Sequence, residues 1–576
     1  MYTRPLPPPC KLHPLALGIL LLPGLGCAQA VPDAGRLLES NRAPALIAPP
    51  GPAPQVLPDA RPAQHAGPGG SQRVPVRAFI LKGVSAFPEA QLQALLQPYA
   101  GRALDFAELS AAAAAVSDHY RAHGYFLASA TLPAQDLGAG QVTIQVLEGR
   151  VSGVTLRPDA TVRLGDAQAR RYLDALVQPG QPVRESALER ALLLTQDLPG
   201  MRVRAEFRPG AELGDTALAL DLAEAPLVNA NIGFDNSSNR YTGRRRLTAG
   251  LQLNDPAGLG DQLSLLGAST GSDFKYARVG YVLPLGAAGT RIGAAYSALR
   301  YRLGEEFEAL DANGRAQVAQ LLLTHPLLRT RRASFQLRAS FEDKRYDNRA
   351  NGVNTSDKRV RVLPFGLVYT GQDRSHGGYT SASLDFTPGH LDLSGNPAFE
   401  AADALAGHSA GRFLRTNYSL SRYQRLAGPV SLMASVSGQF ASTNLESGEK
   451  LSLGGPGRVR AYAAGEASGD EGHVATLEAR LELPALESDL GAFVDYGHVT
   501  LERNPDAGAP ASGSPGKGYA LKGAGLTLSW RPFAGALAQV TVARKIGANP
   551  GAGAGGRDVD GSTARTRAWF QVGVYF

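Results

Sequence analysis

Residues 453–470 read LGGPGRVRAYAAGEASGD, and this stretch decides how the rest of the chain is interpreted. Its many glycines let the backbone fold tightly. Segments on both sides of it alternate apolar and polar residues, which is the period of β-strands. The stretch is therefore predicted to be a tightly folded, charged loop between two strands. Its charged residues are Arg458, Arg460, Glu466 and Asp470.

Strands with a two-residue period fill the chain from Val228 onward, and no helix of any length is predicted there. The clearest strand is 333–341, ASFQLRASF, in which every second residue is apolar and the residues between them are Ser, Gln or Arg. The same alternation appears at 430–440, 526–530 and 568–576. Strands of this kind have one apolar face, and this suits either a β-sandwich or a membrane barrel.

The first thirty residues indicate the compartment. Arg4 and Lys11 precede an apolar run at 15–25, which is followed by Ala-Gln-Ala at 28–30. This order is typical of a secretory signal peptide, so 1–30 is predicted to be removed after Ala30. Cys27 would suit a lipoprotein, but a glycine, Gly24, stands where the lipoprotein signal requires leucine.

The predicted signal peptide places the chain in the cell envelope, and this favours a membrane barrel over a soluble sandwich. The chain is 44% hydrophobic with a mean hydropathy of −0.14, and it has no run of about 18 apolar residues that would form a membrane helix. A barrel has low mean hydropathy because its apolar residues occupy alternate positions. The polar face of the strands includes large charged residues, which suit a wet lumen. At ~10 residues per strand plus loops, the segment 228–576 allows about sixteen strands.

Cysteine content and charge exclude other classes. Both cysteines, Cys10 and Cys27, fall within the predicted signal peptide, so the mature chain would have no disulfide, thiolate metal site or cysteine nucleophile. The segment 1–30 contains two basic and no acidic residues, which leaves the mature chain with a net charge of +5. Such a mild excess favours a basic surface in water, for example a channel lining, over nucleic-acid binding.

Two α+β modules, 74–150 and 151–224, are predicted ahead of the strands. Both show the order β-α-α-β-β, and each helix carries one apolar stripe. In the first module the predicted elements are a strand at 76–82, helices at 88–99 and 106–120, and strands at 125–132 and 142–148. In the second they are a strand at 151–156, helices at 167–177 and 186–197, and strands at 201–207 and 216–222.

A short helix and a long linker precede these modules. Residues 32–43 are predicted to be helical, with Asp33 as the N-cap and Leu37 and Leu38 as the apolar face. Residues 49–70, PPGPAPQVLPDARPAQHAGPGG, are predicted to be an extended linker that forms neither helix nor sheet. The domain boundaries are therefore placed at 31–47 for the helix segment and 48–73 for the linker.

The stretch 453–470 resembles the conserved inward-folded loop of two-partner secretion transporters, the TpsB or haemolysin secretion/activation family. The core of that loop in the family is Val-Arg-Gly-Tyr, and here it is Val459, Arg460, Ala461 and Tyr462. The β-α-α-β-β order resembles a POTRA domain, and a pair of such modules matches the family. Ala461 departs from the family pattern, and its Cβ would be strained if this residue needed a positive φ.

The resemblance implies periplasmic POTRA modules followed by a transmembrane antiparallel barrel in the bacterial outer membrane. It implies export of one large exoprotein partner, such as a haemolysin or an adhesin. The open edges of the POTRA sheets can pair with an extended strand of another chain; the alternative is that the modules are only spacers. In the family the short N-terminal helix lies inside the barrel as a removable plug; the alternative is a disordered N-terminus. Phe576 ends an apolar strand and resembles the signal by which the barrel-assembly machinery inserts such proteins into outer-membrane lipid.

The resemblance also implies how the loop is held. The segment 491–499, GAFVDYGHV, is predicted to be a strand in which Phe493, Asp495 and Gly497 share the face turned to the lumen, because a carboxylate is costly in lipid. An arginine can fork onto a carboxylate through two hydrogen bonds, so Arg460 is predicted to pair with Asp495. The alternative is that each charge is hydrated in a wet pore. The loop residues implied are Arg458, Val459, Arg460, Ala461, Tyr462, Gly465 and Glu466.

Three patterns resemble catalytic motifs but lack the required context. Residues 267–271 spell G-x-S-x-G, but two strands flank them where a nucleophile elbow needs a strand and a helix. Residues 551–556 spell G-x-G-x-x-G without a following helix. His119 and His123 lie four residues apart on a predicted helix without a third metal ligand. The sequence therefore predicts no enzyme, metal site, cofactor or nucleic-acid partner.

Two other functions were weighed against export. A barrel-assembly insertase of the same superfamily usually carries more POTRA modules and has no reason to carry the short helix. A passive porin has no reason to carry POTRA modules. A neighbouring gene for a large secreted protein with β-helical repeats would favour export.

Overall fold

The computed structural model describes residues 31–40, 55–57, 73–159, 161–210, 214–373, 377–505, 518–553 and 555–576. The predicted signal peptide, residues 41–47 of the predicted helix segment and most of the predicted linker lie outside the described residues. Within the described ranges, no helix is long and apolar enough to cross a membrane.

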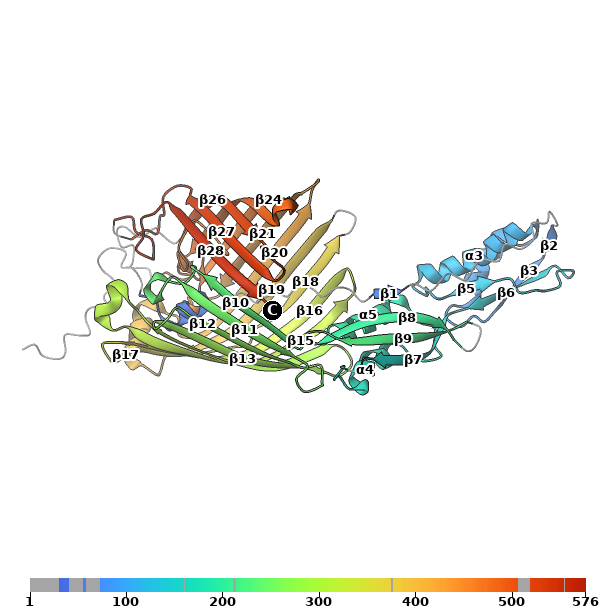
Figure 1. Cartoon of the computed structure of the whole chain (residues 1–576), viewed down its shortest axis with the longest axis horizontal. Helices are drawn as coiled ribbons and strands as arrows, with labels where there is room; N and C mark the ends of the chain where they lie inside the picture. Colours follow the sequence, from blue (N-terminus) through green and yellow to red (C-terminus); the bar gives the residue numbers. More distant parts are fainter. Residues whose placement is uncertain are drawn as a thin grey trace, which may run out of the picture.

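A closed antiparallel barrel of sixteen strands forms the C-terminal part of the chain (Figure 1). Strand β10 pairs with β28, from Asn231 opposite Tyr575 to Asp235 opposite Gln571, and this pairing closes the ring. The strands are β10 (Val228–Asp235), β11 (Arg246–Asn254), β12 (Gln262–Ser269), β13 (Phe274–Leu285), β14 (Thr290–Arg302), β15 (Asn313–Arg329), β16 (Ala333–Ala350), β17 (Val353–Val362), β18 (Phe365–Asp373), β19 (Gly378–Asp392), β20 (Gly411–Arg425), β21 (Val430–Ala441), β24 (Glu471–Leu483), β25 (Ser488–Thr500), β26 (Gly518–Trp530), β27 (Ala536–Lys545) and β28 (Thr566–Tyr575).

Segments β17 and β18 are two halves of one strand. Both halves pair with β16 on one side and with β19 on the other. The break falls at Leu363 and Pro364, because proline has no N–H to donate to the ladder. The backbone N–H of Ser340 still donates to the carbonyl of Pro364 at 2.8 Å, so the wall stays continuous.

Alternation along the strands gives the barrel an apolar outer face. Leu321, Leu477 and Leu526 project outward and are 60%, 53% and 54% exposed. Their neighbours along the same strands, such as Gln320, Glu478 and Thr527, turn to the lumen and are partly or fully buried. A barrel of this kind leaves no open sheet edge in lipid, which is the condition for strands to cross a membrane.

One short helix interrupts the barrel, and the prediction that this part contains no helix was wrong. Helix α6 (Pro397–Ala402) follows β19. The side chain of Asn396 accepts a hydrogen bond from the N–H of Phe399 at 3.0 Å, and Pro397 occupies the first turn. An Asn-Pro helix start of this kind is visible in the sequence.

The first module differs from its predicted β-α-α-β-β order. The predicted strand 76–82 is two strands, β2 (Val74–Val76) and β3 (Ala78–Lys82), which belong to different sheets. An additional strand, β4 (Arg102–Leu104), lies between helices α2 (Glu89–Leu96) and α3 (Phe106–Ala122) and pairs with β2. Strands of three residues are too short to show a period, and this explains why they were missed.

The closing strands of the first module are β5 (Ser129–Thr131) and β6 (Gln141–Leu147). The predicted strand 125–132 was therefore too long. Its first residues form a turn, in which the N–H of Ala128 donates to the carbonyl of Tyr125 at 3.1 Å. Strand β6 lies between β3 and β5, and the two helices pack over this sheet around a core that includes Leu92, Val116 and Ile144.

The second module contains β7 (Arg150–Pro158), α4 (Asp166–Leu176), α5 (Glu185–Gln196), β8 (Met201–Pro209) and β9 (Asp215–Glu224). A further strand, β1 (Gln55–Leu57), comes from the linker and pairs in parallel with β8 at Arg204–Glu206. The prediction that the linker forms no sheet was therefore wrong. Pairing of this kind uses backbone groups, so it leaves no periodic side-chain pattern from which it could be predicted.

The second module is fixed to the barrel through its helix α5. Arg329 at the end of β15 forks onto Asp197, with both N–O distances 2.7 Å, and Arg190 donates to the carbonyl of Pro326 at 2.7 Å. Glu189 accepts from the N–H of Arg331 at 2.7 Å. These contacts place the modules at one end of the barrel, opposite the end reached by β17 (Figure 1).

Candidate functional site

The stretch 453–470 follows the short strand β22 (Leu451–Ser452) and includes the strand that pairs with it, β23 (Ser468–Gly469), and its tip contacts the inner wall of the barrel. Arg460 makes the central contact. Its Nε and Nη2 donate to the two carboxylate oxygens of Asp495 on β25 at 3.0 and 2.8 Å. Its backbone N–H donates to the same carboxylate at 3.0 Å. Asp495 is fully buried, and Thr476 on β24 donates to it at 2.9 Å.

Two further groups hold the same guanidinium. Nη1 of Arg460 donates to Glu478 on β24 at 2.7 Å, and Glu478 in turn accepts from Nε of Arg480 at 2.7 Å. The guanidinium carbon of Arg460 lies 3.2 Å from the centre of the Phe493 ring, which adds a cation–π contact. The carbonyl of Arg460 accepts from the indole N–H of Trp569 on β28 at 2.7 Å. Three strands of the wall, β24, β25 and β28, therefore fix the side chain and the backbone of one loop residue.

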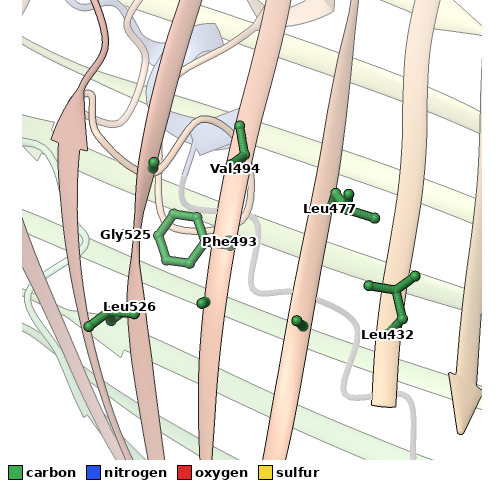
Figure 2. A pocket seen from close by; sticks show the side chains of 9 residues that line it. Leu432, Leu477, Phe493, Val494, Gly525 and Leu526 are labelled. Carbon is green, nitrogen blue, oxygen red and sulfur yellow. The ribbon is translucent and has the colours of Figure 1, made fainter. Parts of the chain in front are cut away.

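The barrel wall is shaped around these contacts. Phe493 is 3% exposed and lies beside Gly525 of β26, where a Cβ would approach the ring to 2.7 Å (Figure 2). The opposite face of the wall is apolar, with Leu477, Val494 and Leu526 around a shallow hollow of about 500 Å³. Gly497 leaves room for the loop, because a Cβ there would lie 2.9 Å from Cγ2 of Val459.

The remaining motif residues fill the space between the loop and the wall. Val459, Ala461 and Tyr462 are completely buried. Ala461 is not among the residues with positive φ, so its replacement of the family's glycine causes no backbone strain. Its Cβ faces Gly523 of β26, where an added Cβ would lie 2.6 Å away. Nζ of Lys545 lies 5.0 Å from the centre of the Tyr462 ring.

The last part of the loop connects it to the segment between β27 and β28. Glu466 is 2% exposed and accepts from the side chain of Asn549 at 2.8 Å and from the N–H of Val559 at 2.7 Å. Gly465 has a φ of +83°, which a glycine adopts without strain. Arg458 donates to the carbonyl of Ser452 and so closes the loop on its own stem.

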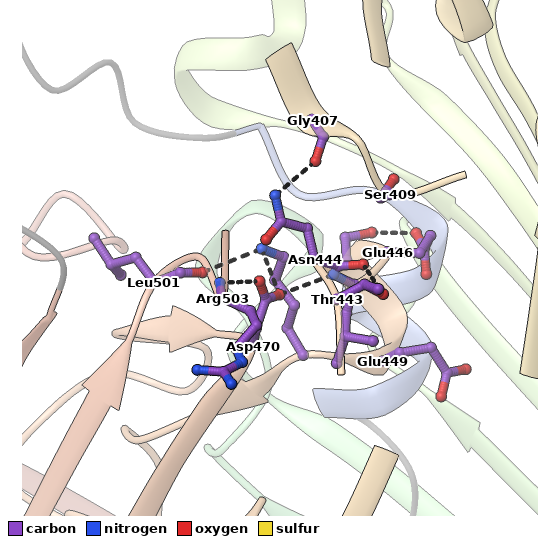
Figure 3. Close-up of polar contacts among 12 residues, drawn as sticks. Gly407, Ser409, Thr443, Asn444, Glu446, Glu449, Asp470, Leu501 and Arg503 are labelled. Carbon is purple, nitrogen blue, oxygen red and sulfur yellow. Dashed lines mark hydrogen bonds and ion pairs between the residues drawn. The ribbon is translucent and has the colours of Figure 1, made fainter. Parts of the chain in front are cut away.

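Asp470 orders the base of the loop (Figure 3). Its buried carboxylate accepts from the N–H of Leu445 at 3.0 Å and from the N–H of Arg503 at 2.9 Å, and it pairs with Lys450 at 2.9 Å. Asn444 bridges the carbonyl of Gly407 and the backbone of Asn504. These bonds tie together three connections at the end of the barrel opposite the two α+β modules.

Helix α1 (Ala34–Ser40) lies inside the barrel against β14, β15 and β16 and against the turn at Ser447–Glu449. Leu37 and Leu38, its predicted apolar face, are 1% and 9% exposed. Asp33 caps the helix by accepting from the N–H of Arg36 at 3.0 Å. The chain therefore brings its short N-terminal helix and the inward loop together, and Arg36 donates to the carbonyl of Gly465 at 3.3 Å.

A buried lysine joins the helix to the wall and to the loop. Nζ of Lys358 on β17 donates to Asp33 at 2.8 Å and to Glu446 at 3.0 Å. Ser447 also donates to Asp33, at 2.6 Å. The N–H of Ala34 donates to Asn348 of β16 at 2.9 Å. The first turn of the helix thus has polar partners on both the wall and the loop.

Other predicted site residues lie apart from this centre. Phe576 bonds to Ala230 through its backbone, with N–O distances of 2.8 and 3.2 Å, and its side chain is 72% exposed. His119 on α3 and His123, the C-cap residue of that helix, lie side by side, with ring centres 4.3 Å apart. Among the residues that the structure describes, no group of three His, Cys, Asp or Glu side chains is placed to hold a metal ion.

Sequence reasoning missed Glu478, Trp569 and Lys358. Glu478 shows the same signal as Asp495, a carboxylate at a lumen position of an alternating strand between Leu477 and Ala479. Lys358 also alternates with outward residues, but its strand is charged on both faces, so its burial could not be read from the pattern. Nothing in the sequence marks Trp569 as a partner of the Arg460 carbonyl.

A family model described as haemolysin secretion/activation protein ShlB/FhaC/HecB matches residues 214–522, and a model of the ShlB-type POTRA domain matches 74–149. The heme/hemopexin transporter protein HuxB of Haemophilus influenzae (strain 86-028NP) is 30% identical over 465 residues, which are 80% of this chain and 81% of HuxB. The outer membrane transporter CdiB of Dickeya dadantii (strain 3937) is 24% identical over 72% of this chain and 74% of CdiB. The solved structure of CdiB from Escherichia coli has the same fold, with a TM-score of 0.68, 22% identity, and coverage of 89% of this chain and 92% of that chain.

Proposed function

The chain belongs to the haemolysin secretion/activation family ShlB/FhaC/HecB, a family of two-partner secretion transporters of the outer membrane, and on this basis we propose that it exports one large exoprotein through its barrel. The exoprotein passes through the lumen as an extended chain. The observation that supports the proposal is that the lumen contains two separate elements of the chain. A loop is pinned to the wall through Arg460, and a separate helix, α1, is seated against that loop.

Helix α1 acts as a plug that leaves the lumen when cargo enters. It is only seven residues long, and its docking contacts include the Asp33–Lys358 pair and the bond from Ala34 to Asn348. Isolated helices of this length are marginal in water, so the barrel supplies most of the order of α1. Release of α1 frees Gly448 and Gly465, and thereby the inner side of the inward loop, for an entering chain.

The POTRA modules supply the edge on which the cargo first pairs. The edge of the second module at β8 is covered by β1 over three residues only. A longer extended segment of the exoprotein replaces β1 by forming the same backbone bonds over more residues of β8. Because β1 and α1 belong to one N-terminal segment, loss of the β1 pairing and loss of the plug are linked by the chain between them.

A secretion assay tests the proposal. The chain is expressed with the exoprotein encoded beside it, and the amount of exoprotein in the medium is measured for Arg460→Ala, Asp495→Ala and Glu478→Gln. Arg460→Ala leaves the buried Asp495 without a cation, and Asp495→Ala and Glu478→Gln each remove one of the two carboxylates that hold Arg460. We therefore expect secretion to fall by roughly tenfold or more. Heat-modifiable migration in gels and surface labelling should show that the barrel is still folded and inserted.

Glu482→Gln is the matched control. Glu482 lies on the same strand as Glu478, but it pairs with Arg425 at 3.3 Å at the periplasmic rim. Its variant should secrete normally. Normal secretion by Arg460→Ala and Asp495→Ala would refute the proposed role of the pinned loop. If deletion of the chain lowers the amounts of other outer-membrane barrels instead of one exoprotein, the chain is an assembly insertase.

A further inference from the structure

A belt of cationic side chains covers the outer surface of the barrel beyond its apolar band. On β13 the outward residues run from Val279 through Ala277 to Lys275, and on β16 from Phe341 through Asp343 to Arg345. The same change from apolar to charged residues occurs on β14, β15, β17, β19 and β20. The cationic members of the belt are Lys275, Arg300, Arg302, Arg315, Arg345, Arg349, Arg359, Arg361 and Arg412; the acidic residues on the same face of these strands are Asp343, Asp347, Asp357 and Asp392.

The register places like charges directly opposite one another. Lys275 is opposite Arg300, and Arg300 is opposite Arg315. On the next strands Arg345 is opposite Arg359. Like charges at directly opposite positions destabilise neighbouring strands. The chain's own carboxylates offset part of this repulsion, since Arg315 is opposite Asp347 and Arg359 is opposite Asp392, and a bound anion would offset more of it.

Several of these cations have no carboxylate of their own. Among the residues that the structure describes, the side chains of Lys275, Arg300, Arg361 and Arg412 form no hydrogen bond or ion pair, although their backbones pair with neighbouring strands. In this second row Arg361 is opposite Asp343 on one side and His390 on the other, and His390 is opposite Arg412. Each row therefore carries more cations than carboxylates.

A hollow of about 360 Å³ opens within the belt, between β15, β16, β17 and the turn after β19. Arg315, Arg345 and Arg359 line it, together with Ser394 and three carboxylates. Asp343 fixes Arg359 through Nε at 2.9 Å, whereas Arg345 approaches its nearest carboxylate only to 4.0 Å and Arg315 to 3.9 Å. Two of the three arginines in the hollow are therefore held only by long ion pairs, so their N–H groups are available to an added anion.

The belt lies at a defined depth in the membrane. The POTRA modules are periplasmic, and β17 reaches the opposite end of the barrel, so the belt faces the outer leaflet (Figure 1). On β17 and β20 only one inward residue separates the cation from the first apolar outward residue, Arg361 from Leu363 and Arg412 from Leu414. At about 3.3 Å per residue, these charges lie within roughly 7 Å of the hydrocarbon, which is the level of lipid headgroups.

We propose that this belt binds the phosphate groups of the phosphorylated glycolipid of the outer leaflet, lipopolysaccharide. Arginine forms two parallel hydrogen bonds with a phosphate, and the apolar residues below the belt accommodate the acyl chains of the same molecule. Bound phosphates offset the repulsion between the opposed cations. The lipid then fixes the height of the barrel in the membrane and anchors the wall segment β15–β17 that contacts helix α1 through Asn348 and Lys358.

Binding of purified lipopolysaccharide to the full-length protein in detergent tests this inference. The test variant is R300Q/R361Q/R412Q, which removes three cations without breaking an internal pair. Attraction of each basic residue to an anionic membrane surface supports a loss of affinity of roughly tenfold or more for the triple variant. The control R332Q/R425Q/R531Q removes three exposed arginines at the periplasmic rim, two of which pair with Glu482 and Asp489, and it should still bind like the unaltered protein.

The chemistry of the ligand is tested in the same assay. Lipopolysaccharide stripped of its phosphates should bind weakly to the unaltered protein, about as weakly as the intact lipid binds to the triple variant. Inorganic phosphate at the same concentration should not displace the intact lipid from the unaltered protein. Unchanged binding by the triple variant, equal loss in the control, or unchanged binding of the stripped lipid would overturn the inference. Competition by inorganic phosphate at equal concentration would show a free-anion site and would overturn it as well. If the triple variant does not fold, R361Q/R412Q and R300Q give the same comparison separately.

Discussion

Gly35 of helix α1 and Gly448 at the base of the inward loop are in direct backbone contact. A Cβ on Gly448 would lie 2.9 Å from Cα of Gly35, and a Cβ on Gly35 would lie 2.9 Å from the nitrogen of Gly448. Cβ atoms do not approach other atoms this closely without displacement. The helix can therefore seat against the loop only because neither residue carries a side chain.

Gly448→Val should expel the helix from the barrel. The added side chain occupies the place of Gly35, so α1 loses its contacts with Lys358 and Asn348 together. We expect the open-channel conductance in planar lipid bilayers to appear more often, by roughly tenfold or more, because a cost of about 1.4 kcal/mol already shifts an equilibrium tenfold.

Gly457→Val is the control for this substitution. Gly457 also lies in the inward loop without a positive φ, but a Cβ there meets no atom within 4 Å. Its variant should conduct like the unaltered protein. Equal conductance of the Gly448 and Gly457 variants would show that the contact between the two glycines does not hold the helix.

Acid should loosen the first POTRA module through Glu148. Its carboxylate accepts from the N–H groups of Ser85 and Ala86 at 2.6 and 2.8 Å and from the hydroxyl of Tyr120 at 2.8 Å. Burial alone would raise the pKa of Glu148, but these donors outweigh it and hold the pKa below its usual value of 4.5. A depressed pKa contributes stability above the unfolded value, and this stability is lost as the pH falls through the folded value.

Hydrogen–deuterium exchange of residues 74–149 in the intact protein measures this effect. Exchange should accelerate as the pH falls below about 4.5, after correction for the intrinsic rate. Glu148→Gln should lower the free energy of opening by about 2 kcal/mol at pH 7 and remove most of the pH dependence. The control Glu89→Gln, at an exposed position of α2, should retain both the free energy of opening and its pH dependence. If the pH dependence of exchange persists in Glu148→Gln, a group other than Glu148 causes it.

A disulfide between the linker and the second POTRA module should block export. Residue 55 is opposite residue 204 in the parallel pairing of β1 and β8, at a strand spacing of about 4.8 Å that a disulfide can bridge. The chain after residue 30 has no cysteine, so Gln55→Cys with Arg204→Cys forms one defined bridge. Secretion should stop under oxidising conditions and return with a reductant. Each single variant is the control, and full secretion by the oxidised double variant would show that cargo does not need this edge.

The features that the sequence predicted well have a period or a strong electrostatic constraint. Alternation over eight or more residues revealed the barrel strands, and a carboxylate at a lumen position made Asp495 a candidate partner for Arg460. The features that were missed depend on three-dimensional contacts. Strands β1 and β4 are three residues long, and the buried Lys358 pairs with Asp33 and Glu446, which are both far from it in the sequence.

Ala461 and Gly523 form a pair in which only one residue can carry a Cβ. Ala461 occupies the position of the glycine in the family's loop motif, and its Cβ contacts the wall where β26 has Gly523. The substitution Gly523→Ala would place two Cβ atoms 2.6 Å apart. The loop tip would have to move away from the wall, and the bonds from Arg460 to Asp495 would lengthen.

We therefore expect Gly523→Ala to lower secretion of the exoprotein severalfold, and Ala461→Gly with Gly523→Ala to restore it. The double variant transfers the Cβ from the loop to the wall, where its next neighbours are the carbonyl of Arg544 at 3.5 Å and the nitrogen of Ala461 at 3.6 Å, both ordinary contacts. Ala461→Gly alone removes one buried methyl group, which costs about 1 kcal/mol, and should secrete nearly normally. If the double variant secretes no better than Gly523→Ala, the loop tip is not held against β26 during export. Restoration would show that the contact between tip and wall is present in the working transporter, because the two substitutions compensate only if the two residues touch.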